Sequence, residues 1–250
     1  MRRFIVAALL GIALLAPWSG APADAAEIKV LSTVGMQPAT PAIFAEFEAA
    51  TGHKVAVTYG LAAVLKNSVL DGARADVLIL TAPTIDELVK ANKVAAASKT
   101  DVARSGVGVG VKAGAPKPDI GTADALKNAI LAAKSIGYSR EGASGVAFAR
   151  AVELLGLTDQ VKAKYKDTGT KASEMVAAGD IELAAAQIPE LLAVPGVDVV
   201  GPLPAELQTV TIFSVGLSTE AKDSDAAKAL IEFLAGPRAA PIYKTKGLGS

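Results

Sequence analysis

Short β-branched runs alternate with longer amphipathic segments along most of this 250-residue chain. Residues 28–31 and 54–59 favour strands, and residues 41–50 between them place apolar side chains on one helical face. Residues 76–80 form an almost continuous apolar run, which is typical of a strand covered by helices on both faces. This strand-helix-strand order predicts an α/β fold with mostly parallel sheets.

A second cycle of the same pattern follows a turn-rich segment at residues 113–118. Residues 136–138 and 181–187 are expected to form strands. Residues 142–155 and 172–178 are expected to form helices, each closed by a glycine. The repeated pattern predicts two lobes, each built from a sheet with helices on both faces.

The end of the chain and one internal segment carry clear boundary signals. Residues 209–217 form a long β run, and residues 224–234 are expected to form a helix with one apolar face. Thr84 and Glu87 have the spacing of a capping box, which predicts that a helix over residues 84–90 begins at Thr84.

The first 25 residues differ from the rest of the chain. Met1-Arg2-Arg3 is basic, residues 4–16 are apolar, and Ala23-Asp24-Ala25 has the small residues of a cleavage site. The apolar run is shorter than the ~20 residues that a membrane-spanning helix needs, so a single membrane anchor is the less favoured alternative. Residues 1–25 are therefore predicted to be a secretory signal peptide, which places the working protein in the periplasm.

Composition excludes several classes of protein. The chain has 25 basic and 25 acidic residues, so no nucleic-acid or membrane-surface partner is expected. It has no cysteine, so neither disulfides nor a lipid anchor on a cysteine is expected, and burial alone must stabilise the fold. With a single histidine as well, we expect no transition-metal site and no cofactor. A monomer is the expected state.

Three loop-to-helix junctions follow predicted strands, at residues 32–37, 60–63 and 139–145. The start of a helix can bind an anion with little formal charge, because unpaired backbone N–H groups and the positive end of the helix dipole meet there. Each junction could also be an ordinary helix start. Because all three fall at equivalent strand ends, they predict one shared anion site. The candidate binding residues in these junctions are Thr33, Val34, Gly35, Met36, Leu61, Ala62, Ser139 and Ser144.

Signals for catalysis are weak. His53 is the single histidine, has no visible partner, and is expected at the surface. The segment 142–145 lacks the spacing of a nucleophile elbow and has no nearby base. The glycines at 106, 108 and 110 lie within a β run, which favours a thin strand between the lobes over a dinucleotide loop. The chain is therefore not expected to be an enzyme.

Five segments, by their order and spacing, resemble the periplasmic molybdate-binding-protein family of ABC importers, within the type II solute-binding proteins. They are EIKVL at 27–31, FAEFEAATG at 44–52, ADVLIL at 75–80, AFARAVELLG at 147–156 and ALIEFLAGP at 229–237. The resemblance implies a two-lobed type II periplasmic-binding-protein fold with a cleft that closes on a small anion. It also implies delivery of that anion to an ABC permease in the inner membrane.

The resemblance further implies limits for the lobes and a change of ligand. Lobe I would comprise residues 26–107 plus 214–250, and lobe II residues 108–213. Relatives that bind oxyanions usually place serines where this chain has Gly35 and Ala62, and often a tyrosine at the position of Gln187. Each missing donor in a dry site costs about 1 to 3 kcal/mol, so molybdate is expected to bind poorly.

Arg140 and Gln187 complete the candidate site. Arg140 could form a bidentate pair with a carboxylate while Ser139, Ser144 and Gln187 orient the rest of the ligand. Alternatively, Arg140 pairs with Glu141, and the Gln187 amide bonds to the backbone. The resulting hypothesis is a periplasmic solute-binding protein that favours an organic carboxylate. A molybdate or tungstate transport protein, an exported sensor module and a periplasmic enzyme on the same scaffold remain as alternatives.

Overall fold

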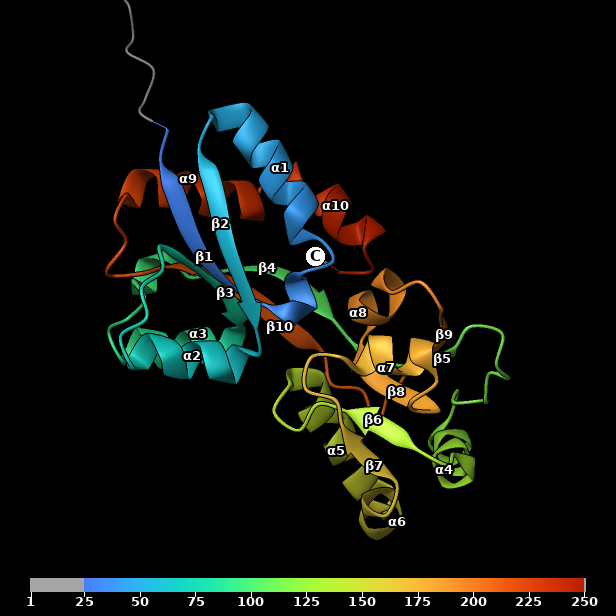
Figure 1. Cartoon of the computed structure of the whole chain (residues 1–250). Helices are drawn as coiled ribbons and strands as arrows, with labels where there is room; N and C mark the ends of the chain where they lie inside the picture. The colour runs from blue at the N-terminus through green and yellow to red at the C-terminus, as the bar shows by residue number, and fades with distance from the viewer. Residues whose placement is uncertain (1–24, 250) are drawn as a thin grey trace, which may run out of the picture.

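The computed structural model describes residues 25–249, so the expected signal peptide at residues 1–25 lies outside the described residues apart from Ala25. The described chain forms two five-stranded sheets flanked by helices (Figure 1). Within residues 25–249, no helix combines the length and the apolar character needed to cross a membrane.

The first sheet has the strand order β2-β1-β3-β10-β4. Strand β1 pairs in parallel with β2 and β3, whereas β10 runs antiparallel to both β3 and β4. All strands except β10 therefore share one direction. The bounds are β1 (Glu27–Thr33), β2 (Lys54–Gly60), β3 (Val77–Thr81), β4 (Thr100–Ser105) and β10 (Thr211–Leu217).

The second sheet repeats this plan with the order β7-β6-β8-β5-β9. Strand β6 is parallel to β7 and β8, and β5 is antiparallel to β8 and β9. In each sheet, the reversed strand is the one that the chain enters from the other sheet. The predicted α/β class with mostly parallel sheets is confirmed. The bounds are β5 (Val107–Lys112), β6 (Ile136–Tyr138), β7 (Tyr165–Asp167), β8 (Leu183–Gln187) and β9 (Val197–Pro202).

Helices cover both faces of each sheet (Figure 1). Helices α1, α9 and α10 share one apolar core with the first sheet, and α2 and α3 form a second core on its other face. Around the second sheet, α4, α5 and α6 lie on one core and α7 and α8 on another. The bounds are η1 (Val34–Met36), α1 (Thr40–Thr51), α2 (Ala62–Leu70), α3 (Ala82–Lys90), η2 (Ala96–Ser98), α4 (Ala123–Ala132), α5 (Ala143–Leu154), α6 (Thr158–Lys162), α7 (Ala172–Ala178), α8 (Ile188–Ala193), α9 (Ser224–Ala235) and α10 (Ala239–Thr245).

The predicted capping box is wrong. Helix α3 begins at Ala82, two residues before the predicted start, and Thr81 is its N-cap residue. The Thr84 hydroxyl bonds to the hydroxyl of Thr81 at 2.7 Å instead of capping the backbone. Pro83 stands in the first turn, where its fixed φ and missing N–H favour a helix start. The proline therefore favours a helix start at Ala82, upstream of the Thr-x-x-Glu pattern.

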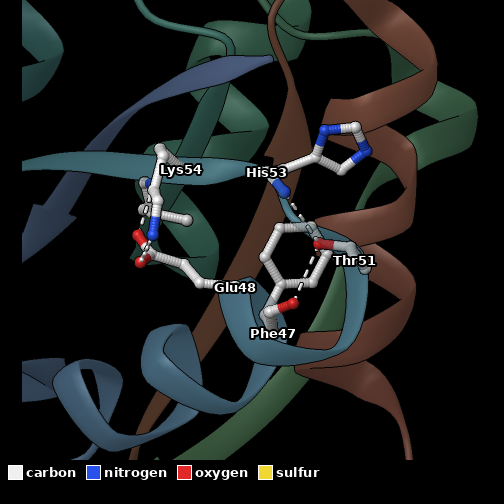
Figure 2. A network of polar contacts seen from close by, with 6 residues as sticks. Phe47, Glu48, Thr51, His53 and Lys54 are labelled. Atoms are coloured by element: carbon white, nitrogen blue, oxygen red, sulfur yellow. Dashed lines mark hydrogen bonds and ion pairs between the residues drawn. The ribbon is translucent and has the colours of Figure 1, made fainter. Parts of the chain in front are cut away.

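His53 has a structural role that its sequence context did not reveal. Its ring stacks on Phe47 with 6.0 Å between ring centroids, and its Nδ1 accepts the backbone N–H of Ala26 at 3.1 Å. Thr51 accepts the His53 N–H and donates its hydroxyl to the Phe47 carbonyl (Figure 2). In the same network, Glu48 accepts the backbone N–H of Val55. His53 is half-buried at the surface, and the partners that the sequence did not show join the end of α1 to the start of β1.

The chain crosses between the sheets at Gly106 and again over residues 203–210. The Gln208 amide holds the two crossings together, because it accepts the Val107 N–H at 2.8 Å and donates to the Val107 carbonyl at 2.9 Å. A Cβ at Gly106 would lie 2.9 Å from the Gln208 amide nitrogen, so only glycine leaves room for this bond. Strand β5 begins at Val107 and β10 at Thr211, so the chain changes sheets within a few residues of the proposed lobe limits.

The glycines of β5 serve packing. A Cβ at Gly108 would come within 2.9 Å of Ile188, and one at Gly110 within 2.8 Å of Leu191. Both neighbours belong to α8. Strand β5 lies inside the second sheet, between β8 and β9, and its missing side chains let α8 pack closely against it. This close packing positions the first turn of α8 at the cleft described below.

Candidate functional site

A small cavity of about 30 Å³ lies between the two lobes. It is bordered by residues at the carboxyl ends of the parallel strands β1, β2, β6 and β8, the edge at which α/β proteins bind ligands. Residues from both lobes line it, and β10 adds one aromatic ring. The lining residues are Thr33, Val34, Gly35, Leu61, Ala62, Ser139, Gly142, Ala143, Ser144, Gly169, Gln187, Glu190 and Phe213.

All three predicted junctions reach this cavity. Of the candidate residues, only Met36 and Arg140 do not line it. Met36 is fully buried in the apolar core between the first sheet and α1, because the short helix η1 turns its side chain inward. Met36 therefore supports the junction from beneath.

Arg140 points away from the cavity. Its side chain is 72% exposed, and its Nε lies 3.7 Å from Asp167 Oδ2. Its guanidinium carbon is 6.0 Å from the centre of the Tyr165 ring. Both partners belong to β7, at the outer edge of the second sheet. Arg140 therefore contacts Asp167 rather than Glu141. It does not line the cavity, where the predicted carboxylate clamp would have to lie.

The start of α5 is shaped by close packing of its loop. Ser139 Oγ accepts the backbone N–H of Gly142 at 2.9 Å, which leaves the hydroxyl hydrogen free to donate. A Cβ at Gly145 would lie 1.7 Å from the Ser139 carbonyl oxygen, so only glycine allows the loop to fold over the first turn. Ser144 lies in that turn and is buried. Free N–H groups and two hydroxyls therefore meet at one wall of the cavity.

Gln187 provides an unpaired buried polar atom. It ends β8, is 2% exposed, and donates its amide Nε2 to Thr211 Oγ1 at 2.8 Å. Its Oε1 is buried and has no hydrogen-bond partner among the described residues. A buried polar atom is normally satisfied by protein or water, and leaving it unpaired costs about 1 to 3 kcal/mol. Because Gln187 lines the cavity, a bound ligand or water is its natural partner.

Phe213 explains why no hydroxyl stands at position 35. A Cβ at Gly35 would lie 2.9 Å from Phe213 Cζ and 3.1 Å from Cε1. The ring of Phe213 is buried and belongs to the core of the first lobe. It occupies the space that a serine side chain would need, so this wall of the cavity is apolar.

Glu190 is the functional candidate that sequence reasoning missed. It lies in the first turn of α8, and its Oε1 would be 3.5 Å from a Cβ at Gly35 across the cleft. Burial, and to a lesser extent the nearby Glu174 carboxylate, raise the pKa of the Glu190 carboxyl to about 7. A strand followed by a proline in the first helical turn, as in Gln187-Ile188-Pro189, was the available signal for α8.

Two larger hollows adjoin the cavity. One of about 450 Å³ shares Ala62 and Ala143 with it, and one of about 210 Å³ shares Val34 and Glu190. The groove between the lobes therefore extends on both sides of the small cavity. Within residues 25–249, no group of three or more His, Asp or Glu side chains is placed to hold a metal ion.

Two lobes, two crossing segments and a cleft at the strand ends define the class of two-lobed solute-binding proteins. The chain belongs to the bacterial extracellular solute-binding proteins, whose family model matches residues 28–249. The resemblance to the molybdate-binding-protein family that the sequence indicated is confirmed.

Two curated relatives match most of the chain. It is 32% identical to an aconitate isomerase from Pseudomonas sp., over 88% of this chain and 87% of the relative. It is 29% identical to the molybdate-binding protein ModA of Azotobacter vinelandii, over 100% of this chain and 98% of the relative. A solved Azotobacter vinelandii periplasmic molybdate-binding protein superposes with a TM-score of 0.78 at 19% identity, covering 89% of this chain and 99% of that one.

Proposed function

We propose that this protein is a periplasmic solute-binding protein that binds a small organic carboxylate between its lobes and delivers it to an ABC permease of the inner membrane. Family membership and the predicted signal peptide support transport and export. Hydroxyls of Thr33, Ser139 and Ser144, together with the N–H groups at the helix starts, supply the donors for the anion.

The observation that carries the choice of ligand is the Phe213 ring at Gly35. It removes a donor from the centre of the site and makes that wall apolar, which suits the carbon skeleton of an organic acid better than a tetrahedral oxyanion. The hollows on both sides give such a skeleton room to extend. One relative is named for its action on aconitate, which is a tricarboxylate, and this supports the same ligand class.

For an organic carboxylate to bind in this cavity, the two lobes must first separate. A cavity of about 30 Å³ has room for about two water molecules, so a carboxylate cannot enter the arrangement described here. The ligand would enter an open form and stabilise the closed form through contacts with both lobes.

A thermal-shift series tests the proposal. The exported protein is heated with molybdate, tungstate, sulfate, phosphate and a set of di- and tricarboxylates. A ligand at 100 times its dissociation constant adds about 2.7 kcal/mol of stability, which shifts the melt visibly. We expect the largest shift with a carboxylate and its loss in Ser144→Ala. Ser224→Ala, at an exposed position on α9, is the control. A larger shift with molybdate than with any carboxylate would contradict the proposed ligand.

Glu190 favours a second candidate function, proton transfer on a bound unsaturated carboxylate. A carboxyl with a pKa of about 7 is suited to take up and return a proton near neutral pH. It would remove a proton from the methylene carbon beside one carboxylate, the double bond would shift by one carbon, and the proton would return to the former vinyl carbon. This is an isomerisation with no redox step.

Nuclear magnetic resonance in deuterium oxide tests this second function. The protein is mixed with trans-aconitate, and formation of the cis isomer and deuterium at the exchanging carbons are followed. Turnover that disappears in Glu190→Gln but persists in Glu232→Gln, an exposed control on α9, would support it. Tight binding without isomerisation or exchange would assign the protein to transport alone.

A further inference from the structure

The charges along the groove conflict with the charge of an anionic ligand. Among the residues that line the small cavity, Glu190 is the single charged side chain within the described part of the chain. The adjoining hollows add Glu174 on one side and, on the other, Glu141 and Asp86, of which Asp86 is paired with Lys99. No lysine, arginine or histidine lines any of the three. An anion seated here would meet a carboxylate with no cation to offset the repulsion.

The surroundings of Glu190 leave this carboxylate without a compensating partner. Helix α8 packs on β5, β8, β9 and η1. Neither β8 nor η1 carries a titratable residue. The charges on the two other strands have partners of their own. Lys112 at the end of β5 donates its Nζ to the Ala178 carbonyl, and Asp198 Oδ1 on β9 lies 4.0 Å from Lys117 Nζ. Gly247 also packs on α8, but Lys246 beside it is exposed to solvent. The charge that acts on Glu190 is that of Glu174 on α7, which has the same sign.

We infer that anion binding in this cleft is coupled to a proton at Glu190: the ligand must present a hydroxyl or acid hydrogen to this carboxylate, or the site must take up one proton. The inference rests on the proposed function, because it assumes an anion in the cavity. A shared proton turns the repulsion between two acceptors into a charge-assisted hydrogen bond. Gln187 Oε1, which also lacks a donor, adds to the preference for ligands that bring one.

Selectivity follows from the same chemistry. Sulfate and molybdate carry no hydrogen near neutral pH, so they can bind only together with a proton from solvent. Hydroxy acids bring their own donor. Because burial already favours the protonated form of Glu190, the site is ready for a hydrogen-free anion below about pH 7 and loses affinity for it above that pH.

Calorimetry of the wild-type protein measures the proton directly. Sulfate and molybdate are titrated at about pH 6 and about pH 8.5 in buffers that differ in ionisation enthalpy. We expect uptake of close to one proton per anion at the higher pH and almost none at the lower, with affinity nearly constant below about pH 7 and falling about tenfold per pH unit well above it. At the higher pH, citrate should bind at least about tenfold tighter than tricarballylate, which lacks only the hydroxyl.

Two variants test whether Glu190 is the group that takes up the proton. Glu190→Gln should bind sulfate without proton uptake and with a flat pH profile, and the citrate preference should disappear. Glu174→Gln should retain the proton uptake but shift its midpoint to lower pH, since it removes a charge that raises the pKa of Glu190. If Glu190→Gln does not fold, the proton count of the wild-type protein decides the question alone.

The outcomes separate this inference from the proposed ligand. Binding of a hydrogen-free anion by wild type at about pH 8.5 without proton uptake would overturn the coupling and leave the carboxylate proposal intact. Sulfate binding by Glu190→Gln, with no carboxylate bound by either form, would support the coupling and overturn the carboxylate ligand. If neither form binds any anion, both are overturned.

Discussion

At the scale of single residues, the cleft is defined by atoms that lack partners. Gln187 Oε1 is buried without a hydrogen bond, and the Glu190 carboxylate has no cation beside it in the described cavity lining. Such groups cost stability in the free protein, and proteins retain them where a ligand satisfies them. Removing such a group should therefore weaken ligand binding without a matching loss of stability.

Gln187→Met tests whether affinity can be lost while stability is kept. The substitution keeps the volume, removes the unsatisfied oxygen and sacrifices the bond to Thr211. Because these effects offset each other, the free energy of unfolding should change by less than about 1 kcal/mol. Affinity for the ligand should fall about tenfold or more. Urea unfolding and calorimetry measure the two quantities, and Gln160→Met, exposed on α6, should change neither. A large loss of stability with unchanged affinity would make Gln187 a purely structural residue.

Gly35→Ser tests the contact with Phe213. The new Cβ would lie 2.9 Å from the ring, so overpacking should destabilise the protein by about 1 to 3 kcal/mol. Phe213→Leu shortens the neighbour, and the double variant should be less destabilised than the sum of the two single variants. Urea unfolding of all four proteins completes the cycle. Simple additivity would show that the ring does not restrict position 35.

At the scale of elements, the interior strands could be predicted from sequence, whereas three of the four edge strands could not. Strand β3 is buried at all five positions and reads as an apolar run. The missed strands β4, β7 and β9 are edge strands, and β7 has only three residues, Tyr165–Asp167. Edge strands are short, polar and half exposed, since they must not pair with other chains, so their alternation is weak.

The candidate site also has a part that the sequence predicts and a part that it does not. The three junctions could be predicted because strand ends and helix starts leave local signals in the sequence. Glu190 and Phe213 could not, since each reaches the cavity through packing between distant segments. Gly35 is 155 residues from Glu190 in the sequence, yet the two face each other across the cleft. The direction of Arg140 depends on Asp167, whose strand was not predicted.

Helix starts provide a prediction at this scale. Asp223 caps α9 by accepting the Ala226 N–H at 3.0 Å, so Asp223→Ala should cost about 1 kcal/mol. Thr84→Ala should change stability by less than about 0.5 kcal/mol, because Thr84 caps no backbone group and alanine has the higher helix propensity. Thermal unfolding of both variants decides the matter. Equal losses would indicate that a capping box forms at Thr84 in solution.

At the scale of the whole molecule, two separate bodies are joined by two neighbouring crossings. The apolar cores of the first lobe share no residue with those of the second. Gly106 and residues 203–210 connect them, and the Gln208 amide ties these crossings to each other. Rigid lobes with a narrow connection favour hinge motion, in which the connecting segments absorb the change and the cores remain packed.

Distance measurements between labels test this motion. The chain has no cysteine, so Asn67→Cys on α2 and Arg150→Cys on α5 place two dyes on exposed positions of opposite lobes. Both helices begin at the cavity, so separation of the lobes there should lengthen the distance between the dyes. We expect a long or broad distribution without ligand and a shorter, narrower one with it, because the ligand contacts both lobes. Asn67→Cys with Glu232→Cys keeps both dyes on the first lobe and should not respond. An unchanged distance between the lobes at saturating ligand would show that the cleft binds without closing.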